Sequence, residues 1–240
     1  QKGNPKPRIF RNLKEKSLLN RLGFNNKGVD YLVQNLKNKK TNILIGSSIG
    51  KNFDTPNVEA SKDYLYCLEK VYEYSDYIAI NISSPNTQDL RDLSKIEYLD
   101  KLLKLIKRKH KDLSNIFGHK PIFIKISPDE SLENLKDICN LILKNHLDGV
   151  ICSNTTIDHS DPNGLGGISG KPLRKKATEN LMHVRRLVGD ELTIIASGGV
   201  MSADDYLEKI DAGANLVQLY TGFIYEGPKL VDDILNLNSK

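Results

Sequence analysis

The residues best suited to chemistry stand directly after a series of short apolar segments. One such segment, residues 77–82, leads into the polar stretch 83–87, and another, residues 149–152, leads into the polar stretch 153–156. In parallel α/β folds the reactive residues lie at the carboxyl ends of the strands and in the loops that follow them. The sequence therefore predicts an active site assembled from several strand ends of one such fold.

Lys125 is the most informative single residue, because it interrupts the apolar run 121–126. An unpaired ammonium group is costly to bury, so we expect Lys125 to contact an anionic or electron-rich partner. A lysine at a strand end whose ammonium reaches solvent is the structural alternative. A Schiff-base lysine, of the kind an aldolase uses, is the competing chemical role.

Three asparagines, Asn81, Asn86 and Asn154, are predicted to gather at the same edge of the fold. Amide side chains offer donors and an acceptor without charge, which suits a planar heterocycle that bears carbonyl and N–H groups. Each asparagine could equally be a loop residue that bonds its own backbone. Pro85 favours an extended backbone at Ser84 and could aim the serine hydroxyl, but no GxSxG motif supports a hydrolase triad.

The last two apolar segments, residues 192–196 and 216–219, are followed by glycines. Gly198 and Gly199 follow the first segment, and Gly222 follows the second. Glycine allows backbone N–H groups to approach an anion, and (β/α)₈ barrels often bind phosphate in the loops after strands seven and eight. Either glycine site alone could make only a tight turn, but both together favour a phosphate site, which residues 166–170 could close from a neighbouring loop.

Apolar runs alternate with amphipathic stretches along the chain, which predicts βαβ units and a parallel sheet. The predicted strands are residues 42–48, 77–82, 121–126, 149–152, 192–196 and 216–219. The predicted helices are residues 28–39, 59–74, 96–111, 132–145, 178–188 and 203–212. We interpret the segment before the first helix as a loop. Six strands fit either an open doubly wound sheet or a barrel that lacks one or two strands, and no linker divides residues 1–240.

Composition narrows the function classes. The chain has 240 residues, of which 39% are hydrophobic and 27% charged, as expected for one globular domain. A net charge of +5 is weak support for nucleic-acid binding. The three cysteines are far apart, which argues against disulfides and a CxxC zinc site, and we interpret the five histidines as surface residues and predict no metal site. No apolar run approaches the roughly 20 residues that span a bilayer.

Eight motifs, taken together and in order, resemble the dihydroorotate dehydrogenase family. They are NRLGF at 20–24, IGKN at 49–52, NISSPN at 81–86, IKISPD at 124–129, SNTT at 153–156, GGISGKPL at 166–173, SGGV at 197–200 and LVQLYTG at 216–222. The resemblance extends over essentially the whole sequence. It implies an FMN-containing (β/α)₈ barrel, and we expect the first one or two strands of that barrel to precede the sequence given.

The resemblance also implies roles for individual residues. Ser84 would be the base that removes the C5 proton of dihydroorotate, and a serine there is typical of the quinone-reducing class 2 enzymes. Lys125 would act beside the flavin. The orotate pocket would be lined by Asn20, Arg21, Leu22, Gly23, Phe24, Asn81, Asn86, Asn154 and Thr155. FMN would be held by Ser48, Asn81, Lys125, Ser153, Gly170, Gly198, Gly199, Tyr220 and Thr221, although the family often has asparagine where this chain has Ser48.

The implied function is oxidation of dihydroorotate to orotate in pyrimidine biosynthesis, with electrons passed through FMN to a quinone. We expect peripheral membrane contact through a preceding segment, on the cytoplasmic face of a bacterial inner membrane or on the mitochondrial inner membrane. From the residues alone, a Schiff-base aldolase that uses Lys125 and a non-catalytic module for a phosphate ligand remain open. Nucleic-acid binding is less supported, since the lysines of residues 101–111 are typical of a solvated helix face.

Overall fold

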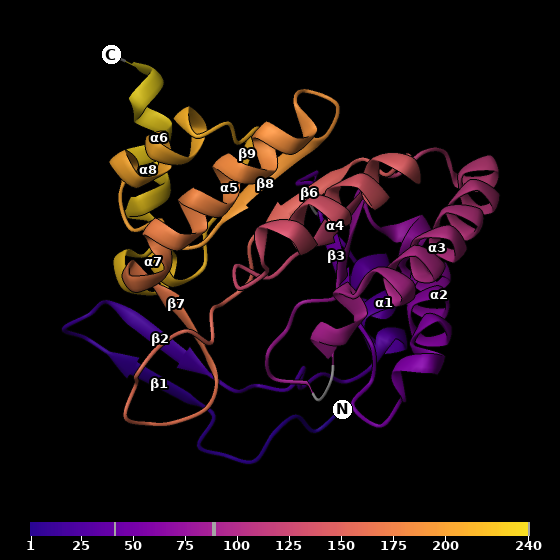
Figure 1. Cartoon of the computed structure of the whole chain (residues 1–240), viewed down its shortest axis with the longest axis horizontal. Helices are drawn as coiled ribbons and strands as arrows, with labels where there is room; N and C mark the ends of the chain where they lie inside the picture. The colour runs from indigo at the N-terminus through magenta and orange to yellow at the C-terminus, as the bar shows by residue number, and fades with distance from the viewer. Residues whose placement is uncertain (41, 88–89, 240) are drawn as a thin grey trace.

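Six parallel strands form the main sheet of the computed structural model, which describes residues 1–40, 42–87 and 90–239 (Figure 1). The strands lie in the order β3-β4-β5-β6-β8-β9. Their bounds are Gly46–Ile49, Tyr77–Asn81, Ile122–Lys125, Gly149–Cys152, Thr193–Ser197 and Leu216–Gln218. All six predicted strands are thus confirmed. The first begins later than predicted, because Ile43 and Leu44 are largely exposed and lie outside the sheet.

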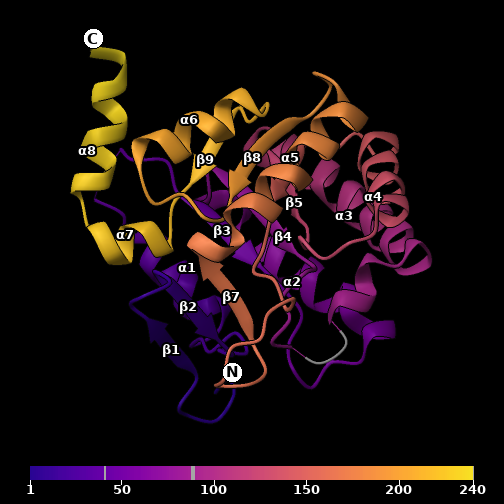
Figure 2. The ribbon, with the colours of Figure 1, turned by 60° about the vertical axis from the view of Figure 1, so that its left-hand side comes forward.

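Helices follow the strands along the chain and cover one face of the sheet (Figures 1 and 2). Helices α1 to α8 are Val29–Lys37, Ala60–Val71, Ile96–Phe117, Leu132–Lys144, Arg174–Val188, Ala203–Asp211, Thr221–Glu226 and Lys229–Leu235. The six predicted helices are confirmed, while α7 and α8 were not predicted. This alternation of parallel strands with helices gives part of a (β/α)₈ barrel, as predicted. None of the described helices is both long enough and apolar enough to cross a membrane.

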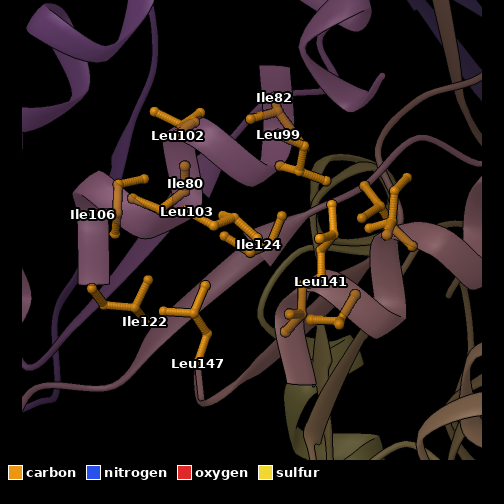
Figure 3. Close-up of a cluster of buried hydrophobic side chains, with 14 of the residues drawn as sticks. Ile80, Ile82, Leu99, Leu102, Leu103, Ile106, Ile122, Ile124, Leu141 and Leu147 are labelled. Carbon is orange, nitrogen blue, oxygen red and sulfur yellow. The ribbon is translucent and has the colours of Figure 1, made fainter. Parts of the chain in front are cut away.

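The core lies between this sheet and its helices. On β4 and β5, alternate residues Ile80, Ile122 and Ile124 point toward the apolar face of α3, where Leu103 and Ile106 meet them (Figure 3). Because strand side chains alternate between faces, the residues between them face the other way. A second apolar cluster occupies that opposite, inner face of the sheet. Its members are Ala79, Phe123, Ile151 and Ile195.

A second, antiparallel sheet was not predicted. It consists of β1 (Ile9–Asn12), β2 (Ser17–Asn20) and β7 (Gly167–Gly170), in the order β1-β2-β7. The interpretation of the first residues as a loop is therefore wrong, as is that of residues 166–170. Both strands of the hairpin have only four residues, and a charged turn without glycine joins them. The strand β7, which pairs with β2, lies about 150 residues later, so neither the local pattern nor the turn residues predict this pairing.

One prediction about the histidines is also wrong. His110 on α3 is only 3% exposed. It stands one helical turn after the buried Ile106, so it shares the face of α3 that packs inward. Its Nε2 atom lies 3.0 Å from the carbonyl oxygen of Lys120, and its ring packs against that of Tyr72. The position of His110 on the inward face of α3 therefore determines its burial, although its side chain is polar.

Candidate active site

The periodicity of the strands brings four polar side chains to one cavity. A residue two positions after an inward-facing one also faces inward. Two positions beyond the apolar residues of the inner face stand Asn81, Lys125, Ser153 and Ser197. All four line a cavity of about 630 Å³ at the carboxyl ends of the parallel strands. The same alternation that builds the inner apolar layer therefore delivers the polar groups above it.

This larger cavity contains most of the predicted cofactor residues. Of that group, Asn81, Lys125, Ser153, Gly170, Gly198, Gly199, Tyr220 and Thr221 line it. Ser48 lines neither cavity of the site, although it lies on the inner face of β3 beside Ala79. The antiparallel sheet contributes residues that sequence reasoning did not find. These are Ile9, Arg11, Leu18 and Ser169.

Lys125 reaches this cavity from the end of β5. Among the described residues, its ammonium group has no hydrogen-bonding or ion-pair partner. Burial lowers the pKa of Lys125, because the charged form loses its hydration without gaining a counter-ion. A buried cation of this kind is satisfied best by an electron-rich or anionic ligand. The geometry fits the predicted contact and differs from a lysine that extends into solvent.

Two glycines after β8 offer backbone donors to the same cavity. Gly198 and Gly199 have φ angles of 118° and 78°, a backbone region that favours glycine. A Cβ atom at Gly199 would lie 2.3 Å from the Cα atom of Arg174. Within the described part of the chain, the N–H groups of both glycines find no acceptor. Unpaired, closely packed backbone donors of this kind are suited to a phosphate group.

A smaller cavity of about 290 Å³ adjoins the first and contains the predicted substrate residues. Its lining consists of Asn20, Leu22, Gly23, Phe24, Asn25, Asn81, Ser84, Asn86, Asn154 and Thr155. Arg21 alone among the predicted set is absent. Its guanidinium group instead donates to the carbonyl oxygens of Pro7 and Asn163, each at 3.2 Å. Arg21 therefore holds loops together rather than facing the cavity.

The asparagines of the site orient one another. The Nδ2 atom of Asn154 donates to Oδ1 of Asn81 at 3.3 Å and to Oγ of Ser83 at 3.1 Å. The Nδ2 atom of Asn86 donates to Oδ1 of Asn20 at 2.9 Å. These bonds fix the side-chain amides before any ligand arrives. A prearranged set of donors and acceptors is what binding a flat polar ring requires.

Ser84 lies in the smaller cavity and is 7% exposed. Its Oγ atom accepts the N–H of Asn86 at 3.3 Å, and its own proton is donated to no described acceptor. Three residues later, the Thr87 hydroxyl is buried and has no hydrogen-bonding partner among the described residues. Two hydroxyl groups with unused capacity therefore stand on the same loop after β4.

The two cavities share a wall. Five residues line both of them, namely Asn20, Leu22, Asn81, Asn154 and Thr155. Lys125 lines only the larger cavity and Ser84 lines only the smaller one. A ligand clamped against the shared wall would thus have the lysine on one side and the serine hydroxyl on the other. This arrangement suits a reaction in which two groups leave opposite faces of one flat molecule.

Arg91 connects the loops that carry these residues, and sequence reasoning did not identify it. Its guanidinium group donates to the carbonyl oxygen of Ser83 at 3.3 Å and to that of Thr155 at 3.0 Å. It also pairs with Asp129 at 2.9 Å. Three loops, those after β4, β5 and β6, are therefore joined through one side chain.

Asp129 is the centre of this ion network, which we define as Arg91, Asp129 and Lys176. Besides Arg91, the Asp129 carboxylate accepts from Lys176 at 2.7 Å and from the backbone N–H of Ile157 at 2.9 Å. Burial by itself raises the pKa of Asp129, but the hydrogen bonds from Lys176 and its other donors outweigh it, so the pKa is lowered. The carboxylate therefore stays charged and holds the loops in place.

Known proteins resemble this chain over nearly its whole length. A family model described as dihydroorotate dehydrogenase matches residues 1–238. The dihydroorotate dehydrogenase (quinone) of Vibrio parahaemolyticus is 49% identical over 242 residues, which cover 98% of this chain and 72% of that protein. The protein of the same name from Shewanella sediminis is also 49% identical, with 98% and 71% covered.

Solved structures agree with these relatives. A crystal structure of DHODH from Eimeria tenella in complex with ferulenol has a TM-score of 0.91 and 33% identity, covering 98% of this chain and 69% of the other. A ligand-free form of the enzyme from the same organism also has a TM-score of 0.91, and the two chains are covered to 100% and 75%. The partial barrel and its antiparallel sheet thus have a close structural counterpart.

Proposed function

The chain belongs to the dihydroorotate dehydrogenase family, and we propose that it oxidises dihydroorotate to orotate in pyrimidine biosynthesis, with FMN as cofactor and a quinone as final acceptor. One observation carries the proposal: two cavities share a wall of amide side chains, with Lys125 beyond it on one side and Ser84 on the other. The oxidation removes a hydride from C6 and a proton from C5, which requires an acceptor on each side of the ring.

The larger cavity fits FMN. Its volume of about 630 Å³ lies in the usual range for cofactor sites, and Gly198 and Gly199 present unpaired N–H groups suited to the phosphate. Lys125 would face the electron-rich edge of the ring system and stabilise the negative charge that develops on reduction. When bound, FMN supplies the hydride acceptor and passes the electrons on to the quinone. Ser153, Gly170, Tyr220 and Thr221 would complete the contacts, with no role assigned to Ser48.

The smaller cavity would hold the pyrimidine ring. Amide groups of Asn20, Asn86 and Asn154 can pair with its carbonyl and N–H edges, and their mutual hydrogen bonds keep them oriented. Positioning of this kind can supply a large part of the barrier reduction, because reacting atoms must be aligned for both transfers. Phe24 and Leu22 provide the apolar lining that excludes water.

Ser84 would take the C5 proton at its Oγ atom. A serine hydroxyl is a weak base, so its own proton must pass to another group as the new one arrives. Thr87 is the candidate for that group, because its buried hydroxyl has no partner among the described residues and stands on the same loop. The N–H of Asn86, which donates to Ser84 Oγ, would hold the serine in its rotamer.

The proposal also includes reduction of a quinone and contact with a membrane. The quinone is supported by the names of the curated relatives. Apolar side chains at the rim of the larger cavity support access for an apolar acceptor: Ile9 is 51% exposed, Tyr220 64% and Ile224 38%. We propose peripheral attachment to a membrane, either the cytoplasmic face of a bacterial inner membrane or the mitochondrial inner membrane.

The decisive experiment is anaerobic mixing of the yellow, flavin-loaded enzyme with dihydroorotate in a stopped-flow spectrophotometer. Wild type should bleach, whereas Ser84→Ala should retain its flavin and bleach 10²- to 10⁴-fold more slowly, since a proton acceptor is lost. Ser61→Ala on α2 is the matched control and should behave as wild type. A colourless wild-type protein would contradict the cofactor, and unchanged bleaching in Ser84→Ala would remove the serine from the reaction.

A further inference from the structure

A cluster of two histidines and one aspartate stands at the amino ends of the strands, outside the site described above. His110 lies near the end of α3, His119 lies in the connection from α3 to β5, and Asp148 immediately precedes β6. One ligand atom from each residue lies within 4.8 Å of the other two. The ring centroids of the two histidines are 5.0 Å apart and the ring planes are inclined at 75°, so the edge of one ring faces the plane of the other.

Two members of the cluster are held in place by the fold. Asp148 Oδ2 accepts the N–H of Ile122 at 2.8 Å, which leaves Oδ1 to meet Nε2 of His119 at 2.8 Å. His110 is buried, and its Nε2 atom lies 3.0 Å from the carbonyl oxygen of Lys120. Outer contacts to a carbonyl and to a backbone N–H are the kind that orient metal ligands in proteins.

The residue types in this cluster are suited to the coordination of a cation. Imidazole is the commonest metal-binding side chain in proteins, and the cluster contains two of them. His119 is exposed, and within the described residues its Nε2 atom is held by Asp148 Oδ1. Two imidazoles and one carboxylate are borderline donors that zinc accepts in tetrahedral sites, with ligand distances of about 2.0–2.2 Å.

We propose that His110, His119 and Asp148 bind one zinc ion, with a fourth position open to water. Ligand atoms around a tetrahedral zinc stand about 3.3 Å apart, so the 2.8 Å contact between His119 and Asp148 must open slightly and the longer spacings, of up to 4.8 Å, must close. The positive charge of Lys107, which acts on His110, opposes the ion. Binding should therefore be weaker than in a closed four-ligand structural site.

The expected effect is on stability. The site joins α3 to the starts of β5 and β6, whereas Lys125 lies at the other end of β5, about 10 Å along the strand. A ligand that binds only the folded state raises the melting temperature by mass action. The proposed reaction should proceed at the same rate with or without zinc, so the proposal is independent of the function assigned above.

Isothermal titration of the flavin-loaded, chelator-treated full chain with zinc chloride tests the proposal. Wild type and the control His183→Ala should each bind one ion per chain with equal affinity. His119→Ala, a change at an exposed position, should weaken binding at least tenfold, and His110→Phe should do the same. Zinc should raise the melting temperature of wild type and the control but not that of the two cluster variants.

Three results would overturn it. Wild type could show no saturable binding. His119→Ala could bind zinc as tightly as wild type, in which case the ion lies elsewhere. His183→Ala could lose as much affinity as the cluster variants, which would indicate diffuse binding by surface histidines. If His110→Phe fails to fold, His119→Ala still decides the question.

Discussion

The two ends of the parallel strands differ in whether their polar groups are hydrogen-bonded. At the amino ends, Asp76, Asp148 and Asn215 each precede a strand and accept a backbone N–H at or just before the start of the neighbouring one, at 2.7–2.8 Å. At the carboxyl ends, Lys125 and the N–H groups of Gly198 and Gly199 have no described partner. Saturated groups stabilise the fold, while unsaturated ones cost stability and await a ligand. One end is thus built for folding and the other for chemistry.

Lys125→Met should show the largest difference between an effect on catalysis and an effect on stability. The change removes a buried, unpaired charge and keeps the length of the side chain, so the melting temperature of flavin-free protein should not fall. Flavin reduction by dihydroorotate should slow by about 10²- to 10³-fold, because stabilisation of the developing charge is lost. Stopped-flow absorbance and thermal unfolding measure the two effects. A normal rate in this variant would mean that the lysine serves only the fold.

Arg91→Met tests a residue that positions the site without facing either cavity. Loss of its bonds to Ser83, Asp129 and Thr155 should let three loops move apart. We expect kcat/KM for dihydroorotate to fall by roughly tenfold to a hundredfold, because misplacement of supporting loops degrades alignment. Lys95→Met, a change at an ion pair on the neighbouring surface, is the control. If Arg91→Met altered stability alone, with kcat/KM as in wild type, the positioning role would be rejected.

Asp76→Ala should show the converse behaviour at the amino ends. The Asp76 carboxylate accepts the N–H of Ile45 and pairs with Lys39. Removal of the acceptor should lower the free energy of unfolding by about 1–3 kcal/mol, with the rate of flavin reduction unchanged. Asp76→Asn retains an acceptor oxygen and should recover part of the loss. Urea denaturation followed by circular dichroism measures both variants.

Asp129→Asn should have the smallest effect of the four variants, a weaker dependence of stability on acid pH. The pKa of Asp129 is lowered in the folded chain, so the unfolded chain binds the proton more readily. The carboxylate therefore contributes stability that is present above its unfolded pKa of about 3.9 and lost as pH falls through the lower folded value. Between pH 5 and 3, the melting temperature of Asp129→Asn should fall less steeply than that of wild type. Equal slopes would contradict the shift.

The parallel strands and most of the site could be predicted because their signals are local. A buried strand is a run of apolar residues in the sequence. In a parallel sheet the reactive residues come directly after such a run, as at residues 81–87 and 125–129. The resemblance to a family then assigned roles that spacing alone left open. Whether Ser84 and Lys125 act as proposed is still a prediction.

The remaining features depend on contacts between distant segments. Arg91 looks like any charged residue until the fold brings the loops of Ser83, Asp129 and Thr155 around it. Ser48 follows a strand signal as the other candidates do and shares the inner face of the sheet with Ala79, yet it lines neither cavity. His110 was misjudged because residue type was weighed above its place on the apolar face of α3. Tertiary geometry decides each of these cases.

Pairing of β2 with β7 sets the order in which the molecule can mature. During synthesis, β1 and β2 leave the ribosome well before β7, yet Asn20 and Leu18 form part of the larger cavity only once β7 has joined them. Contacts of such long sequence separation close late and slowly in folding. The cofactor cavity is therefore finished only after the parallel strands up to β6 have emerged, and until then the edge of β2 that β7 covers is unpaired.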